Sequence, residues 1–79
     1  MWEVYYSQES ATYLEDNGEL ITALFFAIEA LAESDGMPLA GNFQEVQGLV
    51  HWIIQEHLVV YRRLESSQIA RIIFMKPDS

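Results

Sequence analysis

The residues best suited to chemistry are three cations and a histidine in the second half of the chain. Arg62, Arg71 and Lys76 are three of only four basic residues, and His51 is one of two histidines. Cationic groups stabilise the charge that develops when a phosphodiester is cleaved, and a histidine can transfer the proton. The arginines can instead bind a carboxylate through two parallel hydrogen bonds. All four residues are therefore candidates for catalysis, and the two arginines are also candidates for partner binding.

No other pattern in the sequence supports a catalytic, metal or cofactor site. The chain has no cysteine, and two histidines without a helical His pair do not form a metal site. No serine lies in a Gly-x-Ser-x-Gly segment, and no glycine-rich loop is suited to hold a phosphate group. We therefore expect no metal and no cofactor. The hydrophobic surroundings of His51 and His57 favour half-buried structural roles for both.

Length and charge restrict the class of protein and its partners. Residues 1–79 form one small domain, and a hydrophobic content of 51% is enough for a core. The net charge of −8 repels a polyanion unless the bases gather on one face, so we do not expect general nucleic-acid binding. Residues 20–32 are too short and too charged to span a bilayer, and residues 1–6 lack the basic start of a secretory signal. A cytoplasmic protein without membrane contact is expected.

The first half of the chain predicts a strand followed by a helical hairpin. Residues 2–7 are rich in aromatic and β-branched side chains, as in a strand. Ser7 or Ser10 can cap a first helix, which ends at the Asn-Gly pair 17–18. A second helix is expected from Glu19 until the turn residues 34–38. Its apolar stripe consists of Leu20, Ile21, Leu24, Phe25, Ile28, Leu31 and Ala32.

The second half predicts a loop and then a three-stranded antiparallel meander. The loop covers residues 37–48, and the strand segments are 49–55, 57–65 and 68–76. Two-residue hairpin loops pair Ile53 with Leu58, Val60 with Ile73, and Arg62 with Arg71. The fold class is therefore α+β, with the order β-α-α-β-β-β and the helices on one face of the sheet. The edge at which the first strand joins is left open.

Alternation along these strands predicts a sheet that is apolar on both faces. One face holds Val50, Trp52, Ile54, Val59, Tyr61, Ile72 and Phe74. The other holds Leu49, His51, Ile53, Leu58, Val60, Leu64, Ile69, Ile73 and Met75, together with Arg62 and Arg71. One helical hairpin covers only one face, so we expect the second face to bind a partner chain or another copy of the protein. The alternative is that the loop 37–48 or the first strand folds over it.

The predicted pairing of Arg62 with Arg71 also has two interpretations. Like charges directly opposite each other in a sheet are destabilising unless they share an acidic group. That group can belong to this chain, with Glu3 and Glu45 as candidates, in an ordinary surface ion pair. It can also be a carboxylate of a partner, held by the two guanidinium groups.

The order of elements and three short segments resemble the RelE/ParE superfamily of bacterial toxin–antitoxin toxins. The segments are LAESDGMPLAGNF after the second helix, HLVVYRR, and IARIIF in the last strand. The resemblance covers essentially the whole chain. It implies the β-α-α-β-β-β fold, a role in a toxin–antitoxin or plasmid-stabilisation system, and an antitoxin-like partner.

The two branches of this superfamily differ in their chemistry. RelE-like toxins cleave messenger RNA in the ribosome with several basic residues. Here Leu58 stands where that branch has an arginine, and residues 76–79 replace its basic cluster. ParE-like toxins bind and inhibit DNA gyrase, and VVYRR and IARII are closer to this branch, although Phe74-Met75 replaces its His-Gly.

The resemblance therefore implies a toxin-fold protein that acts by protein binding rather than catalysis, with DNA gyrase as a candidate target. The alternatives are a ribosome-dependent mRNA endoribonuclease and a non-toxic homo-oligomer that keeps only the fold. The residues expected to bind the partner are Leu49, Leu58, Val60, Arg62, Arg71, Ile73 and Met75.

Overall fold

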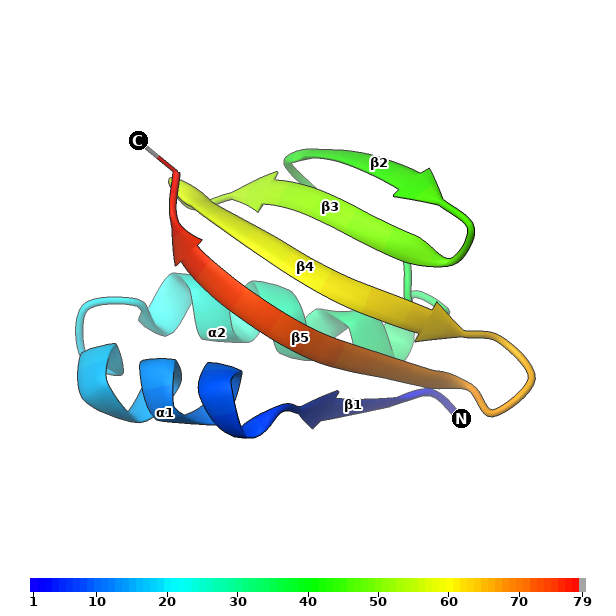
Figure 1. The fold of residues 1–79 in the computed structure, drawn as a ribbon, viewed down its shortest axis with the longest axis horizontal. Helices are drawn as coiled ribbons and strands as arrows, with labels where there is room; N and C mark the ends of the chain where they lie inside the picture. Colours follow the sequence, from blue (N-terminus) through cyan, green and yellow to red (C-terminus); the bar gives the residue numbers. More distant parts are fainter. Residues whose placement is uncertain (79) are drawn as a thin grey trace.

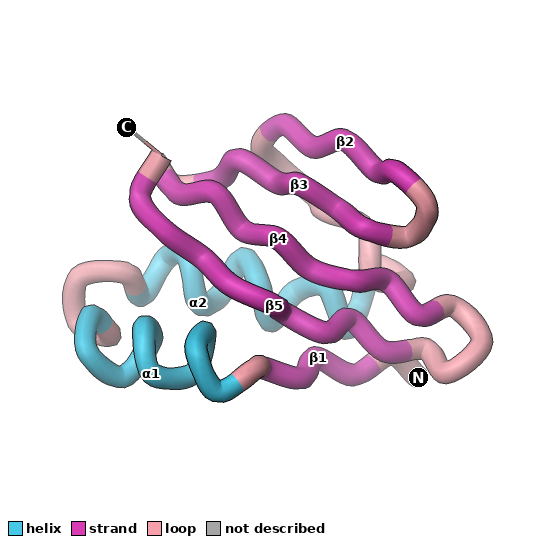
Figure 2. The backbone as a smooth tube through the Cα atoms, viewed as in Figure 1, coloured by secondary structure: helices cyan, strands magenta, loops and turns pink. Residues whose placement is uncertain are grey.

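Two helices lie against one face of a five-stranded sheet in the computed structural model, which describes residues 1–78 (Figure 1). The fold is α+β, as the sequence predicts, and Figure 2 shows helices and sheet as two layers. The elements in chain order are β1 (Glu3–Tyr6), α1 (Gln8–Asn17), α2 (Thr22–Glu29), a 3-10 turn η1 (Ala30–Glu33), β2 (Asn42–Val46), β3 (Leu49–Ile54), β4 (His57–Leu64) and β5 (Ile69–Pro77).

The sheet has the order β1-β5-β4-β3-β2. Strands β2 to β5 form an antiparallel meander, and β1 joins the far edge parallel to β5. The meander therefore has four strands rather than the predicted three, because β2 lies inside the segment 37–48 that was expected to be a loop. The strand is short, and all five of its residues are exposed. It has no buried alternating side chains that would reveal it in the sequence.

Helix α1 begins and ends where the sequence predicts. The Oγ of Ser7 accepts a hydrogen bond of 3.1 Å from the backbone N–H of Ser10, so Ser7 is the N-cap. Helix α2 begins at Thr22 rather than Glu19, because residues 18–20 form a turn closed by a bond of 2.9 Å from the Leu20 N–H to the Asn17 carbonyl. The Leu20 side chain is consequently 87% exposed and does not belong to the buried stripe.

The core lies between the helices and the inner face of the sheet, the face that the helices cover. Two of its aromatic residues also bind the loops that cross its end. The indole of Trp52 donates to the Ala40 carbonyl at 2.8 Å, and the Tyr61 hydroxyl donates to the Gly36 carbonyl at 2.7 Å. Burial raises the pKa of Tyr61 well above its usual value. The buried cluster consists of Ile21, Leu24, Ile28, Leu31, Val50, Trp52, Ile54, Val59, Tyr61, Ala70, Ile72 and Met75.

A β-bulge between β4 and β5 changes which side chains face the core. The pairs Ile53–Leu58 and Arg62–Arg71 are as predicted, but Val60 lies opposite Phe74 instead of Ile73. Ile73 is therefore the extra residue of the bulge. Beyond it the predicted faces are exchanged: Met75, expected on the uncovered face, is buried in the core, and Phe74, expected in the core, is only half-buried on the other face.

Two serines at the start of α1 explain why the bulge forms here. Strand β1 ends at Tyr6, and the next residue donates its backbone N–H to the Ile72 carbonyl at 2.9 Å. The Ser7 hydroxyl donates to the Ile73 carbonyl at 2.5 Å, and the buried Ser10 hydroxyl lies 3.3 Å from the Ile72 carbonyl. These contacts satisfy backbone groups that the interrupted ladder would leave unpaired.

Candidate functional site

The sheet face opposite the helices, called the open face here, is not covered by any described segment. The two segments proposed as alternative covers lie elsewhere: β2, within residues 37–48, extends the sheet at one edge, and β1 extends it at the other. In Figure 1 the helices lie behind or beside the sheet, and its front carries neither helix nor loop. The alternative that residues 37–48 or the first strand fold over this face is therefore wrong.

The strand register arranges the open face in four rows across the sheet. The first row is Glu3, Ile69 and Leu64, and the second is Tyr5, Arg71, Arg62, Leu49 and Val46. The third row is Phe74, Val60, His51 and Gln44, and the fourth is Lys76, Leu58, Ile53 and Asn42. Both the expected partner-binding residues and the candidate catalytic residues recur in these rows, with the exceptions of Met75 in the core and Ile73 in the bulge.

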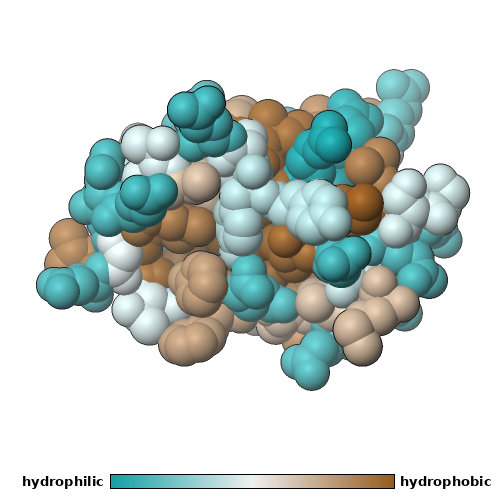
Figure 3. Space-filling view, turned by 90° about the horizontal axis from the view of Figure 1, so that it is seen from below, coloured by the Kyte–Doolittle hydropathy of each residue, from teal (hydrophilic) through white to brown (hydrophobic). Residues whose placement is uncertain are grey.

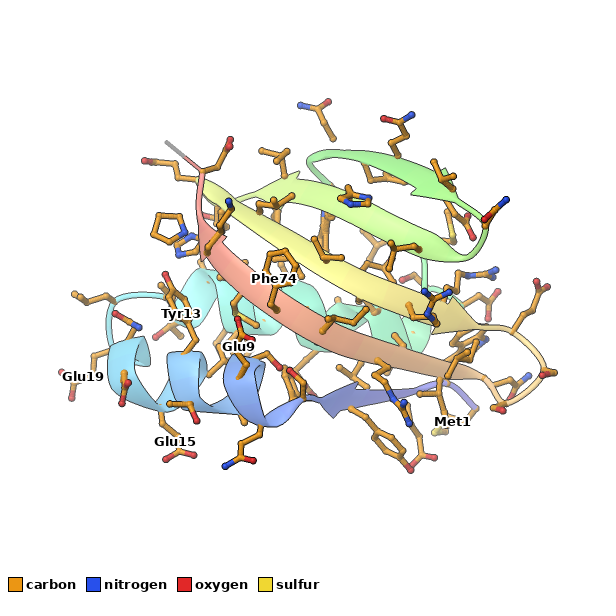
Figure 4. The ribbon with its side chains drawn as sticks, in the orientation of Figure 1. Met1, Glu9, Tyr13, Glu15, Glu19 and Phe74 are labelled. Carbon is orange, nitrogen blue, oxygen red and sulfur yellow. The ribbon has the colours of Figure 1, made fainter. Side chains whose placement is uncertain are left out.

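The middle of the open face is apolar. Val60 is only 4% exposed, although no helix covers it, because its neighbours in the adjacent rows shield it. Leu49, Leu58 and Phe74 are half-buried around it, and Figure 4 shows Phe74 on the front of the sheet. Phe74 was predicted on the inner face, and this prediction is wrong because the alternating strand pattern does not reveal the bulge. A half-buried apolar surface of this kind, without a covering element, is typical of a binding surface.

The open face also carries most of the positive charge of an acidic protein. Arg62 and Arg71 lie directly opposite each other, and Lys76 lies two rows away. Within residues 1–78 none of the three forms an ion pair, since the single pair within 4.0 Å joins Arg63 to Glu65. Of the expected neutralising acids, Glu45 lies on the inner face opposite Val50, and Glu3 makes no such contact. Within residues 1–78, no carboxylate therefore forms an ion pair with Arg62 or Arg71, contrary to the interpretation that Glu3 or Glu45 neutralises them.

Arg63 has a structural role on the inner face. Its guanidinium lies 4.9 Å from the ring centre of the buried Trp2, and its Nε donates to the Asp35 carbonyl at 3.0 Å. Its Nη1 also forms an ion pair of 3.3 Å with Oε2 of Glu65. The adjacent arginines Arg62 and Arg63 therefore have different roles: Arg63 packs on the inner face, and only Arg62 is available on the open face.

The two histidines also differ. His51 is exposed in the third row of the open face, which corrects the expectation that it is half-buried. His57 is half-buried, as expected: its Nε2 lies 2.8 Å from the Tyr13 hydroxyl and its Nδ1 lies 2.8 Å from the Gln55 carbonyl. Since the carbonyl requires a donor, a neutral His57 carries its proton on Nδ1 and accepts the Tyr13 hydroxyl proton at Nε2. This contact joins α1 to the end of the sheet.

The geometry suits binding of an anionic group better than a compact catalytic centre. The Cβ atoms of directly opposed residues such as Arg62 and Arg71 lie about 5 Å apart, so two guanidinium groups can share one carboxylate or phosphate. Lys76 lies two rows away, roughly 13 Å along the strands, and cannot reach the same group. Beside Arg71, a surface depression of about 690 Å³ is lined by Val4, Tyr5, Tyr6, Ser7 and Arg71.

Comparison with known proteins adds no relative. No protein-family model matches the chain, and no curated protein and no solved structure matches it. Within residues 1–78, no three His, Cys, Asp or Glu side chains are placed to hold a metal ion. No helix in the same range has the length and apolar character needed to cross a membrane.

Proposed function

We propose that the protein is a toxin-fold component of a toxin–antitoxin or plasmid-stabilisation system and acts in the cytoplasm by binding another protein through the open face. The observation that carries this proposal is the open face itself. It combines an uncovered apolar centre with an opposed pair of arginines that no acid of residues 1–78 neutralises. Leu49, Leu58 and Val60 supply its apolar part.

The partner class follows from the chemistry of this face. An antitoxin-like segment with an apolar stripe would cover the third and fourth rows and remove their half-buried side chains from water. A carboxylate of the same segment would bind between Arg62 and Arg71, where it offsets the repulsion of the two like charges. DNA gyrase is the candidate target because the sequence resemblance is closer to the ParE branch.

A second function, cleavage of messenger RNA on the ribosome, has one observation in its favour. The four candidate catalytic residues, His51, Arg62, Arg71 and Lys76, all lie on the open face. The net charge of −8 disfavours binding of a polyanion only when the basic residues are scattered, and three of the four basic residues lie together on the open face. These residues are spread over three rows, the second to the fourth, and position 58 is a leucine, so protein binding is the better-supported function.

Growth assays and complex formation test the proposal. The protein is induced alone and together with the small protein encoded next to it, and the two are purified together. We expect growth arrest by the protein alone, rescue by the neighbour, and a stable complex. The Arg62→Gln variant should lose the arrest, whereas Gln8→Glu, which changes the charge by the same amount on exposed α1, should retain it.

Two assays on purified protein then distinguish the two candidate activities, gyrase inhibition and cleavage of messenger RNA. Inhibition of gyrase-driven supercoiling that Arg62→Gln abolishes supports the favoured function. Cleaved message in a cell-free translation reaction would establish the nuclease instead. A protein that forms a dimer, leaves growth unchanged and ignores its neighbour would be a non-toxic homo-oligomer, and that result would refute the proposed function.

A further inference from the structure

A second apolar surface lies on the opposite side of the molecule, where α1 meets α2. Leu20 is 87% exposed and Phe26 is 65% exposed, and the rings of Phe25 and Phe26 lie 5.9 Å apart. Next to them is a groove of about 280 Å³, lined by Leu14, Glu15, Gly18, Ile21, Thr22 and Phe25. We call these residues, with Leu20 and Phe26, the helix groove. Exposed aromatic side chains beside an apolar hollow are typical of a binding surface.

The end of the helix groove is acidic. It adjoins a depression of about 580 Å³ that includes Glu15, Asp16 and Glu19, all of them exposed. Figure 4 shows Glu15 and Glu19 pointing away from the sheet into solvent. Figure 3 shows the side of the molecule that carries α1 and β1, where hydrophobic residues are exposed between hydrophilic ones. The groove therefore pairs apolar walls with a negative end.

No positive charge of the helical layer compensates these acids. Residues 7–36 contain seven acidic residues and no lysine or arginine, because the first basic side chain of the chain is Arg62. Glu29 accepts a hydrogen bond from the Tyr6 hydroxyl, but Glu15, Asp16 and Glu19 have no ion pair within residues 1–78. The potential over the groove is therefore strongly negative and favours a cationic occupant.

We infer that the helix groove is a docking site for a basic amphipathic helix of another protein. Its apolar face would cover Phe25, Phe26 and Leu20, and its lysines or arginines would lie against Glu15 and Glu19. A helix fits better than an extended strand, because the groove lies between two helices and presents no free backbone edge for strand addition. The site is independent of the open face, which has the opposite charge.

A second copy of this chain is a poorer occupant. Its own helices contain no base, so they would repel the acidic end of the groove. Its basic residues all lie in β4 and β5, which are strands. Self-association through the groove would therefore require the open face of one molecule to contact the helices of the next.

The test uses two designed, fluorescein-labelled helical peptides of about 15 residues, one of leucine and lysine and one of leucine and glutamate. Fluorescence anisotropy is measured with the whole chain at low and high salt. We expect the lysine peptide to bind, with an affinity that falls at high salt, and the glutamate peptide not to bind. The double variant L20S/F26S should weaken binding about tenfold or more, because it removes the exposed apolar contacts.

Matched controls locate the site. Leu39 is 74% exposed on the loop before β2, so Leu39→Ser should leave the affinity unchanged. Glu19→Lys should weaken the lysine peptide several-fold, whereas the equal charge change Glu33→Lys in η1 should have a smaller effect. Equal loss in L20S/F26S and Leu39→Ser, or equal binding of both peptides, overturns the inference. A dimer that both Phe26→Ser and Arg62→Gln dissociate would show that a second copy is the occupant and also overturns it.

Discussion

Replacing Met75 by alanine should destabilise the protein more than replacing its larger neighbour Phe74. The Met75 side chain is 4% exposed and packs in the central cluster, so truncation leaves a cavity and costs about 2–5 kcal/mol. Phe74 is half-buried on the open face, where water can fill the vacated space. Its truncation loses only part of the transfer free energy of a phenylalanine, about 1–1.5 kcal/mol.

The measurement is urea unfolding followed by tryptophan fluorescence, because the buried Trp52 lies in edge contact with Tyr61 and reports loss of the core. Free energies of unfolding are compared at equal m-values. For a domain of this size, each kcal/mol corresponds to a change in Tm of about 4–8 °C. Met75→Leu serves as a mild variant that should cost less than about 1.5 kcal/mol if Met75→Ala does not fold.

The order of the two truncations tests the bulge directly. A ladder without the bulge would place Phe74 in the core and Met75 on the open face. Phe74→Ala would then cost about 3–5 kcal/mol and Met75→Ala much less. A larger loss for Phe74→Ala than for Met75→Ala would therefore refute the register described here, and with it the composition of the open face.

Three further predictions concern the turns, the helix cap and the tyrosines. Ser7→Ala removes both the α1 cap and the bond to the Ile73 carbonyl and should cost about 1–2 kcal/mol in urea unfolding, whereas Ser66→Ala in an exposed turn should cost almost nothing. Gln55 and Glu56 form the β3–β4 turn with φ of 49° and 59°, so the pair Gln55→Asn and Glu56→Gly should raise the free energy of unfolding by about 1 kcal/mol or more; no gain in Tm would contradict this turn geometry. Burial raises the pKa of Tyr6 and Tyr61 above their ordinary value, with the Glu29 carboxylate adding to the effect at Tyr6, so their stabilising contribution is complete below about pH 10 and is lost as the pH rises further. The buried Tyr61 should lower the free energy of unfolding by at most about 1.4 kcal/mol per pH unit there, and the half-buried Tyr6 by less, because solvent screens its hydroxyl. A urea midpoint that stays constant between about pH 9 and 11 would contradict the burial of both hydroxyls.

Local signals in the sequence were sufficient for most elements. The cap at Ser7, the stop at Asn17-Gly18 and the two-residue turn at Gln55-Glu56 each depend on neighbouring residues, and the structure has all three. The inner face of the sheet was predicted correctly up to Ile72 for the same reason, because alternation along β3 and β4 is uninterrupted.

The two features that were missed depend on contacts between distant segments. Strand β2 is held by pairing with β3 alone, and its exposed residues leave no periodic pattern. One signal was present: Gln47-Gly48 forms a turn with φ of 55° and 81°, the conformation that Asn-Gly pairs favour in hairpins. The bulge at Ile73 depends on hydroxyl groups from Ser7 and Ser10, more than sixty residues earlier, and no local rule could have located it.

The part of the candidate site whose register is set by local turns was predicted correctly, and the part that follows the bulge was not. Arg62 and Arg71 lie opposite each other because their register is counted from a nearby turn. Met75 was assigned to the partner-binding set and lies in the core, since it follows the bulge. Lys76 lies beyond the bulge as well, and the shift that removes Met75 from the open face brings Lys76 onto it.

The basic residues and most acidic residues lie in different parts of the sequence, and the fold places most of them on different sides of the molecule. All basic residues lie from Arg62 onward, and that segment forms the centre of the sheet, while the seven acids of residues 7–36 lie in or beside the helices. Three of the four bases therefore face away from the helical layer. Partners of opposite charge would bind the two sides, so raising the salt concentration should weaken both complexes while charge variants of one side leave the other intact. If Arg62→Gln and Glu19→Lys each affected both binding reactions equally, the two surfaces would not be independent.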